Sequence, residues 1–337
     1  LTVRKDVTAP TINIISPTLN ELFGTYAPSF NVEIYDANLD SMWYTLDNGL
    51  TNTIFTTNET ISQSAWDVLP NGNVIIRFYA NDSVGNIEFA EVTIRKDVNA
   101  PIIAINNPQN SDVIGATAPN FDISIDELNL DKTWYSLNGG NNITFTGLTG
   151  TINQALWDAL FEGNVIIRFY ANDTLGRIGF VEVTVRKDVT APTINIISPT
   201  LNELFGTYAP SFNVEIYDAN LDSMWYTLDN GLTNTIFTTN ETISQSAWDV
   251  LPNGNVIIRF YANDSVGNIE FADVTIRKDV NAPIIAINNP QNSDVIGATA
   301  PNFDISIDEL NLDKTWYSLN GGNNITFTGL IGTINQA

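Results

Sequence analysis

Carboxylates are the reactive groups that this chain carries in number. Its 337 residues include 38 Asp and Glu against 14 Lys and Arg, which gives a formal net charge of −24, and the chain has neither Cys nor His. A thiol nucleophile, an imidazole base, a disulfide framework and a zinc site are therefore excluded. Carboxylate and amide oxygens remain, and these hard ligands suit Ca²⁺. So acidic a chain should also repel nucleic acid and anionic membrane surfaces.

Oxygen-bearing side chains recur at a spacing of two residues in the string Asp36-Ala37-Asn38-Leu39-Asp40. Glu127, Asn129 and Asp131 repeat the spacing further along the chain. The string lacks the glycine and the distal glutamate of an EF-hand loop. Two interpretations are open, because such residues can bind a cation together with other segments or can shape a turn and pair with basic side chains.

A repeat of 91 residues organises the chain. The string Arg-Lys-Asp-Val recurs at Arg4, Arg95, Arg186 and Arg277. A longer period lies on top of it, since residues 1–155 and 183–337 differ at only three positions, Leu1/Val183, Glu91/Asp273 and Thr149/Ile331. We therefore predict the tail of a preceding repeat at 1–3, repeat A at 4–94, repeat B at 95–185, a second A at 186–276 and a second B, lacking its last strands, at 277–337. This last repeat is either the end of an excerpt from a longer chain or is completed by another chain.

Apolar residues alternate with polar ones along each repeat, as in half-buried strands. Phe30–Ile34 and Val74–Ala80 show the pattern, and only Ser62–Leu69 could hold a helical turn. Between Phe89 and Ala90 the alternation changes phase, which predicts a bulge. Seven short strands in about 90 residues predict an antiparallel β-sandwich of the immunoglobulin (Ig) type. The fold class is thus all-β, a tandem array of such domains, and no apolar run is long enough to span a membrane.

The junctions between repeats contain almost no linker. Val92–Ile94 closes one strand and Arg95–Pro101 opens the next repeat, with no run of Gly or Ser between them. Proline fixes its own φ and restricts Ala100 to extended conformations. We expect a stiff, extended rod, with a flexible string of domains as the alternative.

In a sandwich of this topology, the start of the first strand shares a pole with the second–third and sixth–seventh loops. Acidic side chains of these segments should gather where one domain meets its predecessor. The candidate Ca²⁺ ligands are Asp6, Asp36, Asn38, Asp40 and Asp82 in repeat A, and Asp97, Glu127, Asn129, Asp131 and Asp173 in repeat B. Alternatively, the inter-domain basic pairs neutralise these carboxylates; the pairs comprise Arg4, Lys5, Arg95, Lys96, Arg186, Lys187, Arg277 and Lys278. No cofactor other than Ca²⁺ is expected.

Several strings resemble known repeats. Trp43 resembles the core tryptophan of Ig domains. The strings Asp6-Val7-Thr8-Ala9-Pro10 and Tyr79–Asn86 resemble those that open units, and lie late in them, in tandem Ig-like repeats of archaeal and bacterial surface proteins. The resemblance covers the whole chain and implies an extracellular, cell-surface location. Proteins of this class serve as S-layer components, stalks, adhesin rods and filament subunits.

Other surface features leave alternatives open. Seven Asn-x-Ser/Thr sequons are candidate glycosylation sites: Asn58, Asn81, Asn142, Asn172, Asn240, Asn263 and Asn324. Trp66 and its counterparts Trp157 and Trp248 either cap the core or form a sugar-binding platform. Arg77 and its counterparts Arg168 and Arg259 lie over an aromatic ring, face solvent or bind a carboxylate of a partner.

The carboxylates recur in each repeat, as structural residues do, whereas an enzyme would concentrate them in one distinct cleft. We therefore predict a non-enzymatic structural repeat that binds copies of itself to build a filament, sheath or S-layer. The alternative is an adhesin stalk or an array of modules that bind carbohydrate or protein. Observation of the chain in a regular assembly would favour the structural repeat, whereas a monomer with a bound glycan would favour the binding module.

Overall fold

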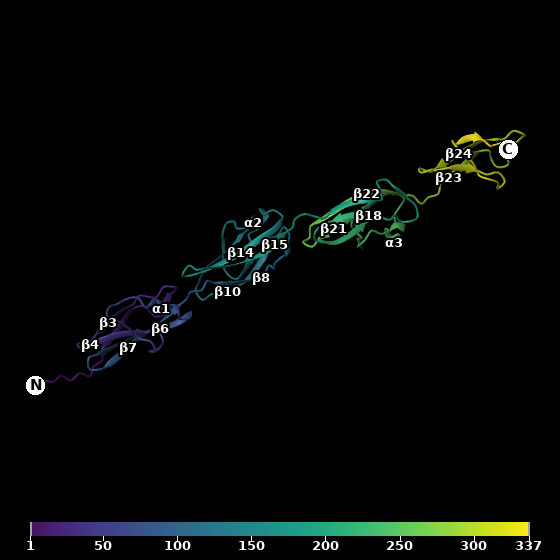
Figure 1. Ribbon diagram of the computed structural model, residues 1–337. Helices are drawn as coiled ribbons and strands as arrows, with labels where there is room; N and C mark the ends of the chain where they lie inside the picture. Colours follow the sequence, from purple (N-terminus) through teal and green to yellow (C-terminus); the bar gives the residue numbers. More distant parts are fainter. Residues whose placement is uncertain (1, 336–337) are drawn as a thin grey trace. The chain divides into compact units, whose positions relative to one another are not determined.

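The computed structural model describes residues 2–335 and divides between Val189 and Thr190 into two compact units. The first unit contains domains 1 and 2, and the second contains domains 3 and 4. Every domain is built mainly of β-strands, which confirms the all-β prediction (Figure 1). The described helices are five-residue turns, so none of them could cross a membrane.

Domain 1 packs a two-stranded sheet of β1 and β3 on a five-stranded sheet with the order β2-β7-β6-β4-β5. Its elements are β1 (Thr11–Ser16), β2 (Leu22–Phe23), β3 (Asn31–Tyr35), β4 (Leu39–Thr45), β5 (Thr53–Phe55), α1 (Gln63–Asp67), β6 (Gly72–Asp82) and β7 (Ile87–Lys96). Most neighbours are antiparallel, but β2 pairs parallel with the end of β7. The core lies between the sheets, where Phe30, Tyr44 and Phe78 contact one another.

Domain 2 has the same architecture. Its sheets have the orders β13-β10-β8 and β12-β11-β14-β15-β9. Its elements are β8 (Ile102–Asn107), β9 (Val113–Ile114), β10 (Asn120–Asp126), β11 (Leu130–Leu137), β12 (Ile143–Phe145), β13 (Thr149–Thr151), α2 (Gln154–Asp158), β14 (Gly163–Asp173) and β15 (Ile178–Lys187).

Domains 3 and 4 lie in the second unit. Domain 3 repeats domain 1, with β16 (Thr193–Ser198), β17 (Leu204–Phe205), β18 (Asn213–Tyr217), β19 (Leu221–Thr227), β20 (Thr235–Phe237), α3 (Gln245–Asp249), β21 (Gly254–Asp264) and β22 (Ile269–Lys278). Domain 4 contains β23 (Ile284–Asn289), β24 (Asn302–Asp308), β25 (Thr315–Tyr317), β26 (Ile325–Phe327) and β27 (Ile331–Thr333). Its sheets are β23-β24-β27 and β25-β26. Among the residues described, domain 4 thus lacks partners equivalent to β14 and β15.

The prediction that Trp43 is the core tryptophan is wrong. Tyr44 is the core residue, only 1% exposed, and Trp43 stacks on Tyr79 at 5.4 Å between ring centroids. Adjacent residues of a strand face opposite sides of the sheet, so only one of this pair can be buried. Phe89 contacts Tyr79 on the same outer face. The predicted bulge is absent as well, because β6 and β7 pair without a register shift and Phe89 simply faces outward.

Trp66 fills the core instead. It is fully buried, and its Nε1 donates a hydrogen bond to the carbonyl of Gly24 at 2.9 Å. Ser62 caps the short helix α1 that carries it. Trp157 and Trp248 are buried in the same way, which excludes a sugar-binding platform at these three positions.

Arg77 lies on the outer face of its sheet. Its guanidinium lies over the ring of Phe89 at 4.7 Å and pairs with Glu91 at 2.6 Å. Arg168 and Arg259 repeat these contacts with their own aromatic and acidic neighbours. The expectation of an arginine over an aromatic ring is therefore confirmed.

Candidate functional site: the acidic poles of the domains

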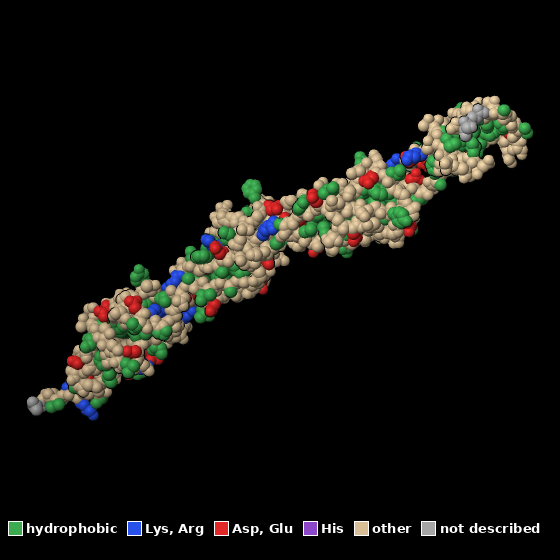
Figure 2. Space-filling model, turned by 45° about the vertical axis from the view of Figure 1, so that its right-hand side comes forward, with side chains coloured by type: hydrophobic (Ala, Val, Ile, Leu, Met, Phe, Trp, Pro, Cys, Tyr) green, Lys and Arg blue, Asp and Glu red, His purple; other side chains and the backbone are tan. Residues whose placement is uncertain are grey.

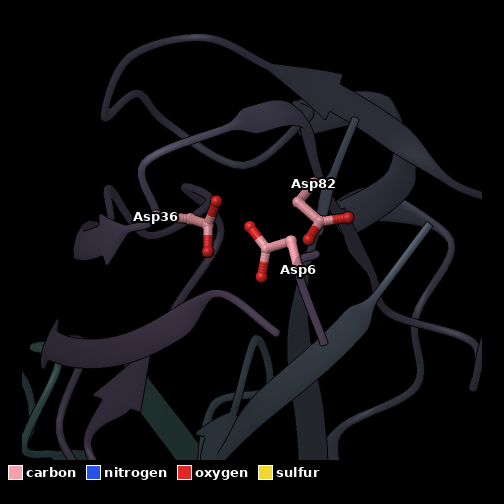
Figure 3. Close-up of side chains that lie close together, drawn as sticks. All are labelled: Asp6, Asp36 and Asp82. Carbon is pink, nitrogen blue, oxygen red and sulfur yellow. The ribbon is translucent and has the colours of Figure 1, made fainter. Parts of the chain in front are cut away.

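Three carboxylates of domain 1 come together from segments that are far apart in the chain. Oxygens of Asp6, Asp36 and Asp82 all lie within 4.8 Å of one another (Figure 3), and we call this cluster the A pole. Asp6 precedes β1, Asp36 precedes β4 and Asp82 ends β6. Asn38 also reaches the cluster and donates its amide to Asp6 Oδ2 at 2.7 Å. Sequence reasoning had placed these four residues at one pole.

The loop after β6 holds Asp82 in place. This side chain is 1% exposed, and its Oδ1 accepts the backbone N–H groups of Val84 and Asn86 at 3.0 and 2.9 Å. Its Oδ2 accepts the Asn86 amide at 2.7 Å. Burial raises the pKa of Asp82, but these hydrogen bonds outweigh it and hold the pKa below its usual value. Asp82 is therefore a buried carboxylate kept in its charged form.

No basic side chain neutralises the A pole. Among residues 2–335, no Lys or Arg forms an ion pair with Asp6, Asp36 or Asp82. Arg4 and Lys5, the basic pair of this repeat, are exposed. Three like charges at this separation repel one another and favour a bound cation. The donor set consists of hard oxygens, which fits Ca²⁺.

Asp40 and Asp131 lie outside the clusters, which corrects the predicted ligand set. Asp40 accepts the amide of Asn81 at 3.3 Å, and Asp131 accepts that of Asn172 at 3.1 Å. The physical reason is that each lies in a strand, β4 or β11, beyond the loop that carries the other ligands. A shift of pairing register between Leu39 and Ser41 accompanies the change of direction.

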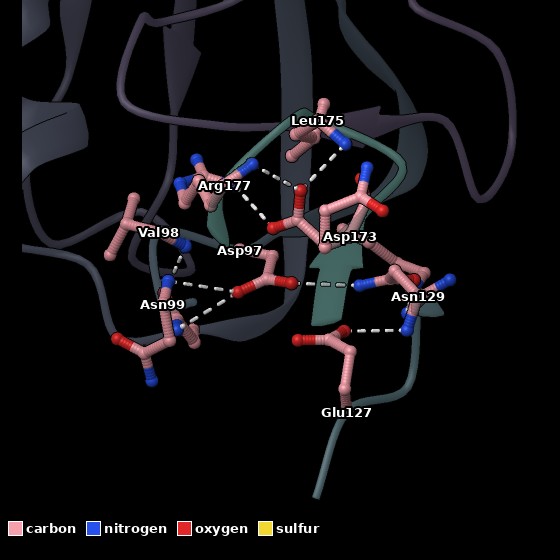
Figure 4. A network of polar contacts seen from close by, with 11 residues as sticks. Asp97, Val98, Asn99, Glu127, Asn129, Asp173, Leu175 and Arg177 are labelled. Atoms are coloured by element: carbon pink, nitrogen blue, oxygen red, sulfur yellow. Dashed lines mark hydrogen bonds and ion pairs between the residues drawn. The ribbon is translucent and has the colours of Figure 1, made fainter. Parts of the chain in front are cut away.

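Domain 2 gathers the equivalent carboxylates into what we call the B pole. Oxygens of Asp97, Glu127 and Asp173 lie within 4.8 Å of one another, and Asn129 donates to Asp97 Oδ2 at 2.8 Å. A basic residue is present here, because Arg177 Nη1 lies 3.0 Å from Oδ2 of the fully buried Asp173 (Figure 4). The B pole therefore contains its own cation.

The distinction between Asn86 and Arg177 is a structural difference that sequence reasoning missed. Both residues follow a glycine, in Asp82-Ser83-Val84-Gly85-Asn86 and in Asp173-Thr174-Leu175-Gly176-Arg177. An alignment of repeat A on repeat B at these positions would have revealed the change. The third domain keeps the asparagine, since Asn268 donates to Asp264 Oδ2 at 2.7 Å.

Within the first unit, hydrogen bonds cross from domain 1 to domain 2. Arg95, near the end of β7, donates Nη2 to Asn129 Oδ1 at 2.6 Å. Asn71, in the loop before β6, accepts the N–H of Val98 at 3.1 Å and donates to Asp97 at 3.3 Å. The second unit repeats the first of these contacts between Arg277 and Asn311. Arg95 and Arg277 thus orient the asparagine of the pole, and Arg186 Nη2 lies 3.7 Å from Oδ2 of Asp188, the counterpart of Asp6 and Asp97.

The lysine of each basic pair that closes a domain turns back into that domain. Lys96 is 4% exposed, and its Nζ donates to the carbonyls of Trp66 and Leu69, each at 2.7 Å, at the end of α1. Lys187 and Lys278 make the same contacts in their domains. A cation suits the carbonyl groups left unpaired at a helix end. The last strand of each complete domain is therefore anchored at its final residue.

The sequons fall into two structural groups. Asn58, Asn142, Asn240 and Asn324 are exposed. Asn81, Asn172 and Asn263 are partly buried, and each donates its amide to an aspartate of the neighbouring strand. An amide held in this way is less accessible for modification. Asn58 and Asn240 donate their amides as well, to Asn31 and Asn213, and glycosylation stays a prediction for all seven asparagines.

Comparison with solved structures finds similarity to arrays of tandem domains. No family model and no curated protein matches the chain. Among solved structures, it is similar to a bacterial ice-binding adhesin with 14% identity and a TM-score of 0.43, covering 82% of this chain and 100% of that one. A tetra-tandem repeat from the extending region of a large adhesion protein has 15% identity and a TM-score of 0.37, covering 97% and 88%. A Ca²⁺-stabilised adhesin of an Antarctic bacterium has 15% identity and a TM-score of 0.38, covering 98% and 91%.

Proposed function

We propose that this chain is a non-enzymatic structural repeat of an extracellular surface protein, in which successive domains join into a stiff rod. The observation that carries the proposal is the anchoring of two adjacent residues. Lys96 is fixed inside domain 1, and the next residue, Asp97, belongs to the pole of domain 2. A single peptide bond between two anchored side chains leaves no free linker about which the domains could swing.

The repetition of the sequence supports a structural role. The acidic residues recur in successive domains and lie at their poles. The outer faces repeat as well, because a tryptophan stacks on a tyrosine in each of the first three domains. Such identical surfaces at regular intervals suit lateral contacts between copies of the chain. Assembly into a filament, sheath or S-layer is the form of this function that we propose.

Electron microscopy of the native material tests the proposal. Ordered fibres or sheets with a repeat of one domain, about 35–40 Å for strands of this length, are the expected result. Isolated straight particles would support a stalk in place of an assembly. Bent particles with a broad distribution of end-to-end distances would contradict the stiff rod.

We propose further that Ca²⁺ is the cation of the A pole and has a structural role only. The three carboxylates of Asp6, Asp36 and Asp82 have no basic partner, and the buried Asp82 stays charged. The B pole, in which Arg177 pairs with Asp173, needs no such ion. Domains 1 and 2 would then differ in their dependence on calcium.

Isothermal titration calorimetry of the whole chain distinguishes Ca²⁺ binding at the A pole from binding at the B pole when a matched pair of variants is compared. Asp36 and Glu127 occupy equivalent positions, and each accepts the N–H of the asparagine two residues later. We expect Asp36→Asn to lower the Ca²⁺ stoichiometry by one, and Glu127→Gln to leave it unchanged. Equal losses in both variants, or no Ca²⁺ binding to the parent chain, would contradict the assignment.

A further inference from the structure

A row of apolar side chains crosses the outer face of the five-stranded sheet in domain 1. Ile54 of β5 lies opposite Trp43 of β4, and Trp43 lies opposite Tyr79 of β6. Phe89 of β7 lies opposite Tyr79 and continues the row across a fourth strand, over about 14 Å at the usual spacing of strands. We call these four residues the outer row. Its two ends, Ile54 and Phe89, are exposed, and Figure 2 shows that groups of green, apolar side chains reach the visible surface of the molecule.

The outer row recurs in the next two domains. In domain 3 the same four residue types occupy the same register: Ile236, Trp225, Tyr261 and Phe271. Domain 2 keeps the three aromatic residues and has Thr144 in place of the isoleucine. The core lies on the other side of each sheet, and the carboxylates lie at its end, so that neither of them uses these side chains. A partner that binds one outer row therefore finds an equivalent surface on other domains of the chain.

Charge on this face is balanced, although the chain as a whole is strongly acidic. Beside the outer row, Arg77 lies opposite Glu91 and forms an ion pair with it. Arg259 and Asp273 form the equivalent pair in domain 3. Two chains with a net charge of −24 each repel one another over most of their surface, but not at this face. In an isologous contact the arginine of each copy meets the acidic residue of the other, so the face is complementary to itself.

The exposed area sets how strongly such a face can bind. Alternation along β6 and β7 places Ile75 and Ile87 on the same face, where each is about half exposed. Together with Ile54 and Phe89 they expose roughly 400 Å² in domain 1, if each side chain has about 200 Å². This is half of the roughly 800 Å² that each partner contributes to a stable interface. Stable association therefore needs the faces of more than one domain.

We propose that the outer row is the surface through which a second copy of this chain binds, row against row; the inference rests on the proposed function, in which copies of the chain assemble. Tryptophan, tyrosine, phenylalanine and arginine are the residues in which protein interfaces are enriched. The rings of the two rows form the centre of the contact, and the Arg77 and Glu91 side chains exchange partners at its rim. Because salt screens the repulsion between acidic chains, association strengthens as NaCl is added, whereas a contact held by ion pairs alone weakens.

Sedimentation velocity of the whole chain, in a chelator and over a series of NaCl concentrations, tests the proposal with matched variants. Ile54→Lys combined with Ile236→Lys places a charge in two outer rows and should raise the dissociation constant at least about tenfold. Val68→Lys combined with Val250→Lys is the control, because these equally exposed residues end the helices α1 and α3 and lie outside the rows. It should leave the constant unchanged. Since all four side chains are exposed, both variants should unfold at the temperature of the parent chain.

Crosslinking tests whether the rows meet directly. The chain contains no Cys, so introduced thiols are the only ones present. With a short bismaleimide, Phe89→Cys combined with Phe271→Cys should give covalent dimers at concentrations where the parent chain associates. Val68→Cys combined with Val250→Cys should give none.

Three results would overturn the proposal: a parent chain that stays monomeric at every concentration, association that weakens as NaCl is added, or equal effects of the two pairs of variants. Ordered fibres in the native material together with equal effects of the two pairs would overturn the role of the outer row and leave the proposed assembly intact. A monomeric chain that binds a neutral glycan through these residues would overturn both and favour the binding module.

Discussion

The acidic poles of domains 1 and 2 have the same carboxylate positions in the same fold, yet they differ in one side chain. At the A pole Asn86 offers a neutral amide to Asp82, whereas at the B pole Arg177 offers a full positive charge to Asp173. Three carboxylates within 4.8 Å repel one another unless a cation offsets them. The difference shows that one architecture accommodates either a neutral amide or a positively charged side chain beside its buried aspartate.

Removal of the resident cation should have the largest effect. In Arg177→Asn, the fully buried Asp173 loses its charged partner, which we expect to destabilise domain 2 by about 2 kcal/mol, less than for a fully buried pair because Arg177 is partly exposed. Hydrogen exchange of peptides from residues 174–187, whose sequence occurs once among the 337 residues, measures this. Added Ca²⁺ should restore the protection.

The restoration is the critical part of that experiment. A variant that is destabilised but insensitive to Ca²⁺ would show that the two poles are not interchangeable. Arg168→Asn provides the control, because it removes an exposed arginine whose ion pair with Glu182 lies on the outer face of the same sheet. That variant should not acquire a response to Ca²⁺.

The reverse exchange should have a smaller effect. In Asn86→Arg, the guanidinium brings a cation to Asp82, so that domain 1 should gain about 1 kcal/mol in the presence of a chelator and lose most of its response to Ca²⁺. Hydrogen exchange with and without chelator measures both, in peptides containing Glu91, which distinguishes domain 1 from domain 3. An undiminished Ca²⁺ response would show that an arginine beside Asp82 does not take the place of the ion.

Acid should weaken the A pole. The pKa of Asp82 is lower in the folded chain than the usual value of 3.8. Its contribution to stability is therefore fully present above pH 3.8 and is lost as the pH falls through the folded pKa. Hydrogen exchange of domain 1 should accelerate as the pH falls below 3.8, after correction for the intrinsic rate. An Asp82→Asn variant that kept the same acid dependence would assign it to another group.

The smallest effect should come from the contact between Arg177 and domain 1. Gly24 leaves room for this guanidinium, since a Cβ there would come within 2.5 Å of Arg177 Nη2. Gly24→Ala should displace the flexible side chain and cost less than about 1 kcal/mol. Gly206→Ala is the matched control, because its Cβ would meet nothing closer than 3.6 Å. Equal changes in thermal unfolding for the two variants would show that Arg177 does not contribute to this joint.

Strand alternation was sufficient to predict the sandwich, because a period of two is a local property of the sequence. It could not decide which side of a strand faces the core, so the choice between Trp43 and Tyr44 depended on resemblance and was wrong. Packing between the two sheets determines which side of the strand is buried, and the sequence of a single strand does not reveal that packing. Trp66 was easier to place, since a large apolar residue in a short helical turn has few other positions to occupy.

The residues of the A pole could be predicted to the extent that the order of the strands determines which segments meet. Asp6, Asp36 and Asp82 come from three segments that the order of strands brings to one end. Asp40 could not be excluded in advance, because its distance from the cluster depends on where β4 begins and on a local shift of register. The contacts of the Arg-Lys pairs could not be predicted either. Alternation along a strand predicts that the two side chains face opposite sides of the sheet, but it does not predict which groups each of them contacts.

The parallel pairing at the end of each complete domain has a mechanical consequence. In domain 1, Leu22 and Phe23, near the start, pair with Arg95 and Lys96 at the end. Tension that pulls the two termini of a domain apart loads these hydrogen bonds along the strand direction, so that they must break together and not one after another. Lys96, held by backbone carbonyls, resists the same displacement. A chain of such domains would yield to force one domain at a time and keep the others intact.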